Sequence, residues 1–312
     1  MVLSVVSAPM IRGNVSSIAR SGSSGTVRVA LISDSAYVMP TAVTIASLED
    51  KLPPLWRLEV ALVGDQLSSD DAAKISQTLD PERTTVVECP VPGDLRPDIY
   101  PMSQRLNKEH SASVWLILHL AELVPPHWNR VLYLDSDIVA CASVTELWLQ
   151  DLGGQAIGAV QDGPVPTIRS EFGLPDWRAL SAKGNEQYFN SGVLLIDLER
   201  WRARNIPQIA RAYIGAREDL VQYDQEVLNW AFFGDWYALD KRWNVTGWWL
   251  HDENRVGRDS DILLSVGLFH FAGRSKPWKS GHKTNTFVDE FYAMLDKTAW
   301  AGWRPAAGAT ED

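Results

Sequence analysis

The first third of the chain alternates short β-branched runs with longer segments of helical pattern, and this alternation constrains the fold most. Strands are predicted at residues 27–33, 58–63 and 84–88, and helices at residues 40–52 and 68–79 between them. Neighbouring parallel strands need a crossover connection, which is usually a helix. The sequence therefore predicts an α/β fold built on a parallel, doubly wound sheet.

The rest of the chain continues this pattern with longer loops. Residues 111–123 are apolar on most sides and predict a buried helix. The polar stretch 163–185, which Pro and Gly interrupt, is long enough for a functional loop or lid. Further strands are predicted at residues 131–134, 156–160, 193–197 and 268–271, and further helices at residues 198–205 and 222–232. The expected organisation is a flexible Ser/Gly-rich leader over residues 1–26, one α/β domain over 27–285, and a C-terminal helix and tail over 286–312.

Composition and charge exclude several classes of protein. The 312 residues carry 29 Lys and Arg against 39 Asp and Glu, a net charge of −10, which argues against binding nucleic acid or an anionic bilayer by bulk charge. No apolar run approaches the roughly 18–20 residues that span a bilayer, so no transmembrane segment is expected. Cys89 and Cys141 form no metal or redox pattern, and we expect them to be reduced thiols in a cytoplasmic protein.

The sharpest local motif is Asp135-Ser136-Asp137, which follows the apolar run VLYL. In an extended segment, side chains two residues apart point to the same side, so the two carboxylates can converge on one cation. Carboxylate oxygens suit Mg²⁺ or Mn²⁺, and ligands of open α/β sheets bind beyond the carboxyl ends of strands. A lone Asp-x-Asp is more often a solvated turn or a helix cap, and the strand before it favours the metal site.

Three further stretches combine polar residues with a predicted element. The run 189–193 places polar residues and Gly before a strand. This pattern is typical of a backbone that closely approaches a ligand, or of an ordinary turn that leads into a strand. The run 223–226 is typical of the acidic N-terminus of a helix. At residues 270–278, a His that ends a strand is followed by Gly273 and Lys276, which suit a phosphate group. A metal held by two carboxylates and His270, beside a diphosphate held by Lys276, would explain two of these motifs together.

Four segments in this order carry a family resemblance: LYLDSDIV, YFNSGVLLIDLERW, QYDQEVLN and HFAGRSKPW. They resemble glycosyltransferase family 8, which includes the bacterial lipopolysaccharide α-galactosyl- and α-glucosyltransferases and glycogenin. The likeness runs from about Val27 to about Trp278. It implies a GT-A fold with one Rossmann-like, mixed or mostly parallel sheet flanked by helices. It also implies a UDP-sugar donor, a Mn²⁺ cofactor, with Mg²⁺ as the other choice, and a retaining transfer.

The resemblance also assigns roles to individual residues. Metal ligands are expected at Asp135, Asp137 and His270, and residues next to the reacting sugar at Asn190, Asp224 and Gln225. Contacts with the donor nucleotide-sugar are expected at Asp34, Tyr37, Asp135, Ser136, Asp162, Ser191, Gly273 and Lys276.

The chain departs from the family in the helix before the Asp-x-Asp strand. The family often carries an Arg there, whereas residues 113–118 read SVWLIL, and Arg105 or Lys108 is the nearest substitute. The expected activity is transfer of galactose or glucose to a glycan or another hydroxyl acceptor, by front-face substitution because Gln225 is a poor nucleophile. The missing Arg keeps open a non-catalytic nucleotide-sugar or glycan-binding module. A glycogenin-like, self-glucosylating protein is the other alternative.

Tryptophan is in excess in the second half of the chain, where the resemblance implies the acceptor side, although packing in the core is the more common role for any single Trp. Ten of the 14 Trp residues lie after residue 170, and indole faces stack on sugar C–H surfaces. A lipid-linked glycan acceptor would place the chain in lipopolysaccharide biosynthesis, with peripheral contact at the inner membrane face. The tail of the chain has no basic cluster, which favours a soluble acceptor or a weak aromatic membrane contact. The candidates for an acceptor platform are Trp177, Trp243, Trp248 and Trp249.

Overall fold

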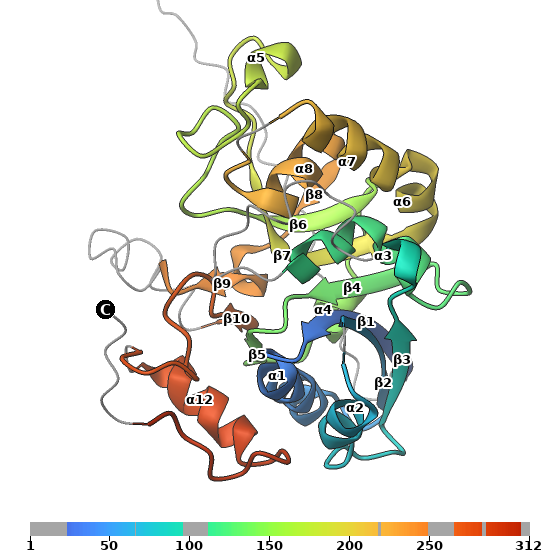
Figure 1. Ribbon diagram of the computed structural model, residues 1–312, viewed down its shortest axis with the longest axis vertical. Coiled ribbons are helices and arrows are strands. Elements are labelled where there is room, and N and C mark those ends of the chain that lie inside the picture. Colours follow the sequence, from blue (N-terminus) through green and yellow to red (C-terminus); the bar gives the residue numbers. More distant parts are fainter. Residues whose placement is uncertain are drawn as a thin grey trace, which may run out of the picture.

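The computed structural model describes residues 24–65, 67–95, 112–217, 220–248, 265–282 and 285–306 (Figure 1). Its centre is a seven-stranded sheet in the order β3-β2-β1-β4-β7-β6-β8. The strands are β1 (Gly25–Asp34), β2 (Trp56–Asp65), β3 (Thr84–Pro90), β4 (Arg130–Leu134), β6 (Ile157–Gln161), β7 (Phe189–Asp197) and β8 (Trp236–Ala238).

The sheet is mixed. β1 runs parallel to β2 and β4, and β2 runs parallel to β3, as the alternation of strands and helices predicts. β7 runs antiparallel to both of its neighbours, β4 and β6. The parallel arrangement that the alternation predicts is confirmed for the strands of the first third, and the mixed, mostly parallel GT-A sheet implied by the resemblance is confirmed for the whole sheet. The direction of β7 depends on partners distant in sequence, which local pattern does not reveal.

Helices cover both faces of the main sheet (Figure 1). Alternate residues of β1 divide between two apolar cores: Val29 and Leu31 pack with α1 and α2, whereas Ala30 packs with the helices of the opposite face. One face carries α1 (Val38–Lys51), α2 (Ser69–Ser76) and α4 (Thr145–Trp148), and the other carries the 3₁₀ helix η4 (Ala112–His119), α3 (Leu120–Leu123), α6 (Leu198–Arg204), α7 (Ile206–Gly215) and α8 (Tyr223–Ala231).

A second, three-stranded sheet adjoins the first. It consists of β5 (Ile138–Ala140), β10 (Leu268–His270) and β9 (Val245–Thr246), with β10 antiparallel to β5 and parallel to β9. Its apolar residues share a core with α12 (Thr286–Leu295), a helix within the predicted C-terminal segment. The Asp-x-Asp motif lies in the link from β4 to β5 and so joins the two sheets.

Several elements differ from the sequence-based expectation. The predicted helix over 111–123 is mostly a 3₁₀ helix, η4, followed by the short α3. Strands β5, β8 and β9 and the helix α7 were not predicted. The stretch 163–185 is not a simple loop, since it carries α5 (Trp177–Leu180) and a small apolar cluster that includes Ile168 and Leu174. Residues 1–23, Arg105 and Lys108 lie outside the described residues.

No helix in the described ranges is long and apolar enough to cross a membrane.

Candidate active site and metal centre

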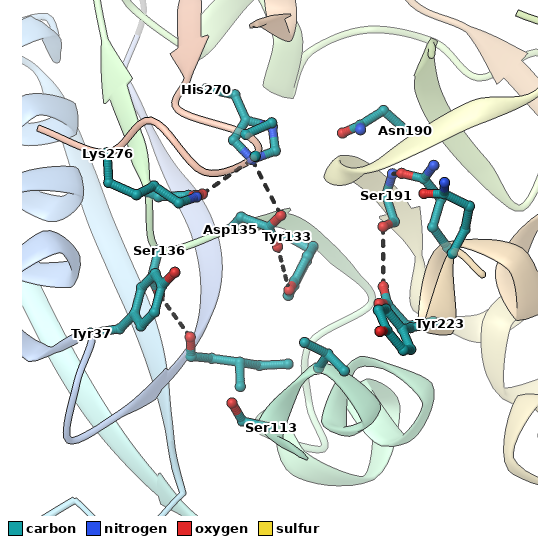
Figure 2. Close-up of a pocket in the computed structure, with 18 of the residues that line it drawn as sticks. Tyr37, Ser113, Tyr133, Asp135, Ser136, Asn190, Ser191, Tyr223, His270 and Lys276 are labelled. Carbon is teal, nitrogen blue, oxygen red and sulfur yellow. Dashed lines mark hydrogen bonds and ion pairs between the residues drawn. The ribbon is translucent and has the colours of Figure 1, made fainter. Parts of the chain in front are cut away.

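A cavity of about 480 Å³ opens where β1 and β4 end (Figure 2). Its walls come from five regions: the ends of β1 and β4, the start of η4, the start of β7, the N-terminus of α8, and the loop after β10. The cavity gathers nearly all of the residues predicted for the site: Asp34, Tyr37, Asp135, Ser136, Asp137, Asn190, Ser191, Asp224, Gln225, His270, Gly273 and Lys276.

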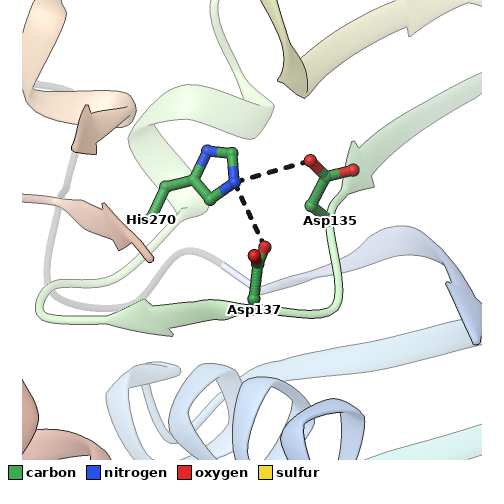
Figure 3. A group of neighbouring side chains, drawn as sticks. All are labelled: Asp135, Asp137 and His270. Carbon is green, nitrogen blue, oxygen red and sulfur yellow. Dashed lines mark ion pairs between the residues drawn. The ribbon is translucent and has the colours of Figure 1, made fainter. Parts of the chain in front are cut away.

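Three potential metal ligands converge on one wall (Figure 3). One ligand atom from each of Asp135, Asp137 and His270 lies within 4.8 Å of the other two. Nε2 of His270 is 3.1 Å from Oδ1 of Asp137 and 3.5 Å from Oδ2 of Asp135. Oδ1 of Asp137 is buried and, within the described residues, has no hydrogen-bond partner besides this contact. Two carboxylates and an imidazole around a buried acceptor fit Mn²⁺ or Mg²⁺.

The link between the two aspartates is held to its neighbours by hydroxyl groups. Ser136 Oγ donates a 2.7 Å hydrogen bond to the carbonyl of Ile32 at the end of β1. Thr44 Oγ1, from the buried face of α1, donates a 2.8 Å hydrogen bond to the carbonyl of Ile138. The small side chain between the carboxylates lines the cavity and also anchors the motif to the main sheet. This anchoring fixes where both carboxylates point.

The charged groups of the cluster shift one another's pKa values. Burial raises the pKa of Asp137, but the neighbouring Lys276 and His270 outweigh burial and hold that pKa well below its usual value. Burial keeps the pKa of Asp135 raised although His270 opposes it. Burial is the largest single influence on the pKa of His270 and lowers it, but the charge of Asp137, the hydrogen bond with Asp137 and the charge of Asp135 together raise that pKa above its usual value. Lys276 is 7% exposed, pairs with Asp137 and donates a 2.7 Å hydrogen bond to the carbonyl of Phe271.

The opposite wall is a hydrogen-bonded set of polar side chains from β7 and α8. Ser191 donates from its backbone N–H to Oε1 of Gln225 (3.0 Å) and from Oγ to Oδ2 of Asp224 (3.1 Å). Asn190 Nδ2 donates to Oδ2 of Asp162 at 3.0 Å. Asp162 itself is buried behind this wall and does not line the cavity. Asp162 therefore meets the cavity lining through its hydrogen bond with Asn190, and its contact with the donor stays a prediction.

Asp224 is the acid of this wall with the most shifted pKa. Burial first, and then the charge of Asp135, raise the pKa of Asp224 to about 7. The carboxyl group of Asp224 therefore binds its proton much closer to neutral pH than an ordinary aspartate does. A cation bound by Asp135 would remove part of that repulsion and favour the carboxylate.

The predicted nucleotide end of the cavity lies at the end of β1. Oδ1 of Asp34 accepts hydrogen bonds from the backbone N–H groups of Ala36 (2.9 Å) and Tyr37 (3.1 Å). Oδ2 of Asp34 accepts from Ser113 Oγ at 3.4 Å. The Tyr37 ring meets Trp278 edge-on, with ring centroids 5.7 Å apart, which holds the phenol against the cavity.

Several residues of the site were not predicted. Tyr133 donates a 2.8 Å hydrogen bond to Oδ1 of Asp135, and its position two residues before that aspartate was an available signal. Tyr223 lines the cavity with φ of 47°, a strained conformation for a bulky residue, and its ring meets the fully buried Trp115 edge-on. Asn244, behind the cavity, contacts His270 and Asn190.

The structure corrects part of the tryptophan expectation. Trp243 is 4% exposed and belongs to the apolar core, so it offers no face to an acceptor. Trp177 packs on the small cluster of the 163–185 stretch, and Trp248 lies against Gly163. Trp249 is outside the described residues. Trp177 and Trp248 therefore remain as predictions for the acceptor side.

Comparison with known proteins decides the family. Residues 28–281 match the family described as "Glycosyl transferase family 8". The chain belongs to glycosyltransferase family 8. Over 87% of its length it also resembles the crystal structure of the galactosyltransferase LgtC in complex with donor and acceptor sugar analogues, with 26% identity, a TM-score of 0.71 and 96% of that chain covered. This family member therefore has a GT-A fold.

Curated relatives match over part of their length. "General stress protein A" of Bacillus subtilis is 29% identical over 181 residues, which cover 55% of this chain and 60% of that protein. "Probable galacturonosyltransferase-like 5" of Arabidopsis thaliana is 31% identical over 188 residues, 57% of this chain and 51% of that protein. The family 8 chain thus spans between half and two thirds of these relatives' own length.

Proposed function

We propose that this protein is a retaining glycosyltransferase that moves galactose or glucose from a UDP-sugar to a hydroxyl of a glycan or another acceptor. Mn²⁺, or Mg²⁺ in its place, is the proposed cofactor. The observation that carries the proposal is the cluster of Asp135, Asp137 and His270, with Lys276 beside it, on the wall of a cavity of about 480 Å³. The likeness to LgtC, a galactosyltransferase solved with donor and acceptor sugar analogues, supports the same class of reaction.

The metal-binding wall is the proposed diphosphate side. Asp135, Asp137 and His270 would hold the cation, which supplies positive charge against the departing diphosphate. Lys276 adds a second positive charge at the same wall. Gly273 has φ of 83°, which turns the loop after β10 around the cavity and suits a backbone that approaches phosphate oxygens.

The β7–α8 wall is the proposed sugar side. Oε1 of Gln225 accepts a hydrogen bond from the backbone N–H of Ser191, and the neutral amide of Gln225 is a poor nucleophile. We therefore favour front-face substitution. The bond from the anomeric carbon to the phosphate oxygen breaks while the acceptor oxygen forms its bond on the same face, and the acceptor proton passes to the departing phosphate oxygen. Asn190 and Asp224 would hold the sugar hydroxyls during this exchange.

A UDP-hexose panel with Mn²⁺ tests the proposal. Asp137→Ala and His270→Ala are expected to abolish turnover, whereas Asp296→Asn, at an exposed carboxyl outside the cavity lining, serves as the matched control. Full turnover by the wild-type protein after thorough chelation would contradict the metal assignment. A covalent sugar trapped on Asp224 or Gln225 would replace front-face substitution by a double displacement.

The same assay separates the alternatives. UDP release from a UDP-hexose excludes a non-catalytic binding module, which is the alternative raised by Trp115 lying in a stretch that often carries an Arg in the family. A mass increase of the intact protein on incubation with UDP-glucose would identify self-glucosylation. Acceptor screening with the preferred donor then tests the proposed lipid-linked glycan and the contact with a membrane surface.

A further inference from the structure

We propose that Asn244 is a positioning residue that aims His270 at the metal and Asn190 at the donor sugar. The inference rests on the proposed function and goes beyond it by linking the two walls of the cavity. Asn244 lies between the short 3₁₀ helix η5 (Lys241–Trp243) and β9, is 2% exposed and does not line the cavity. Its role is therefore exerted through other residues.

Each end of the Asn244 amide contacts one functional wall. Nδ2 of Asn244 donates to Oδ1 of Asn190 at 2.8 Å, and Oδ1 of Asn244 lies 3.0 Å from Nδ1 of His270. Figure 2 shows His270 and Asn190 on neighbouring parts of the cavity wall. One buried amide thus connects the strand that ends in the metal ligand with the strand that begins the sugar side.

The direction of these hydrogen bonds is set by a backbone group. The N–H of Gly192, which can only donate, lies 3.0 Å from one end of the Asn190 amide, so that end is the oxygen. The nitrogen end then donates to the carboxylate of Asp162. Because Asn190 Oδ1 is an acceptor, the end of Asn244 that faces it is the NH₂ group. The oxygen of Asn244 must therefore face His270.

This orientation fixes the tautomer of His270. Asn244 Oδ1 accepts a hydrogen bond from the N–H at Nδ1, so in the neutral ring Nε2 presents its lone pair. Figure 3 shows Nε2 on the side of the ring that faces the two aspartates. That lone pair faces oxygens of Asp137 and Asp135 at 3.1 and 3.5 Å. Three electron-pair donors that face one another repel unless a cation, or a second proton on the ring, lies among them. Asn244 therefore holds the imidazole in the form that binds metal, as outer partners of ligating histidines do.

Two substitutions separate the two functions of Asn244. In Asn244→Ala both contacts are lost, and we expect Mn²⁺ to bind roughly 10- to 100-fold more weakly. In Asn244→Asp a carboxylate still accepts from Nδ1 of His270 but cannot donate to Asn190. We expect Mn²⁺ affinity to match or exceed that of the wild-type protein, while kcat/KM for the UDP-hexose falls roughly tenfold or more because Asn190 Oδ1 now faces a negative charge.

Mn²⁺ affinity is measured by calorimetry on the donor-free protein, with UDP-hexose kinetics alongside. The matched control is Asn229→Ala, because Asn229 is 3% exposed and makes comparable hydrogen bonds, but to the backbone of Phe189 and Gln225 instead of to a metal ligand. Asn229→Ala is expected to lower the melting temperature and to leave Mn²⁺ affinity unchanged. If Asn244→Ala does not fold, the Mn²⁺ affinities of Asn244→Asp and Asn244→Ser are compared instead.

Mn²⁺ affinity within twofold of wild type in Asn244→Ala overturns the inference, and so does a loss of affinity in Asn244→Asp equal to that in Asn244→Ala. Either result leaves the glycosyltransferase proposal intact if wild-type turnover needs Mn²⁺. If the variants change Mn²⁺ affinity as expected but no UDP-hexose is turned over, the proposed function fails while the role of Asn244 toward the metal stands.

Discussion

Asp224 is a cavity residue whose pKa burial brings close to neutral pH. Its pKa is about 7 in the folded protein against an ordinary value of 3.8. The folded state therefore retains a proton that the unfolded state has lost, and stability falls as pH rises between these two values. Well below pH 3.8 the group is protonated in both states and contributes no pH dependence.

Asp224→Asn removes this penalty in the metal-free protein. Because Asp224 is half-buried, we expect a gain of roughly 1–2 kcal/mol in unfolding free energy at pH 8, and little change near pH 4. Thermal melts from pH 4 to 8 with a chelator measure the difference. Asp296→Asn is the control of opposite sign, because Arg304 holds the pKa of Asp296 at about 2. A gain for Asp224→Asn that is equal at every pH would contradict the assignment.

Gly192 leaves space for the metal ligands. An added Cβ would lie 2.4 Å from Cε1 of His270 and 2.7 Å from Oδ2 of Asp135, both closer than real contacts. Gly192→Ala is therefore expected to displace both ligands and to weaken Mn²⁺ binding at least tenfold, with a stability loss of about 1–3 kcal/mol. Gly215→Ala, whose Cβ meets nothing within 4 Å, is the control. Unchanged Mn²⁺ affinity in Gly192→Ala would show that the ligands are not held against this backbone.

At the scale of elements, the local sequence pattern predicts that a strand exists better than it predicts in which direction the strand runs in the sheet. β1 and β4 are short β-branched runs that end in polar motifs, and both were predicted together with the residues that follow them. β7 begins at Phe189, four residues before its predicted start, because Phe189 and Asn190 pair with Gln161 and Val160 of β6. Such pairing comes from contacts distant in sequence, so residues that read as a turn are strand residues in the fold.

The start of α8 depends on a buried acid. Glu226 is fully buried and accepts hydrogen bonds from Tyr213 Oη (2.9 Å) and from the backbone N–H groups of Val221 (3.1 Å) and Gln222 (3.4 Å). These bonds hold the turn that brings Gln222 and Tyr223 to the cavity. Glu226, which does not line the cavity, therefore positions the start of α8, the helix that carries Asp224 and Gln225.

Glu226→Ala should leave these donors unsatisfied and release that turn. We expect a loss of about 2–3 kcal/mol in stability and a raised KM for the donor, measured by chemical denaturation and by initial rates. Glu226→Gln keeps an acceptor, so its stability and its KM should lie between those of the wild-type protein and Glu226→Ala. Ser68→Ala removes the N-cap of α2, which does not reach the cavity, so it should lower stability by about 1 kcal/mol without changing KM. If KM rises in Ser68→Ala as much as in Glu226→Ala for the same loss of stability, Glu226 has no specific role in positioning the donor site.

On the scale of the whole molecule, the metal cluster joins parts that the sequence keeps far apart. Asp135 leaves β4 of the main sheet, Asp137 enters β5 of the small sheet, and His270 ends β10. The motifs predicted that these residues share a site, because their chemistry is complementary. Asn244 was not predicted, since its partners lie 54 and 26 positions away and no local pattern links them. A ligand shared by two sheets should bind the folded protein far better than the unfolded chain.

Mn²⁺ is therefore expected to raise the unfolding temperature of the whole chain. At 100 times the dissociation constant the gain is about 2.7 kcal/mol, or roughly 3–6 °C for a chain of this size. Scanning calorimetry with and without Mn²⁺, after chelation, measures it. His270→Ala should abolish the shift, because the small sheet then contributes only Asp137. An equal shift in His270→Ala would place the ion elsewhere. If Mn²⁺ raised the unfolding temperature of only part of the calorimetric transition, the two sheets would unfold separately, and the cluster would not join them.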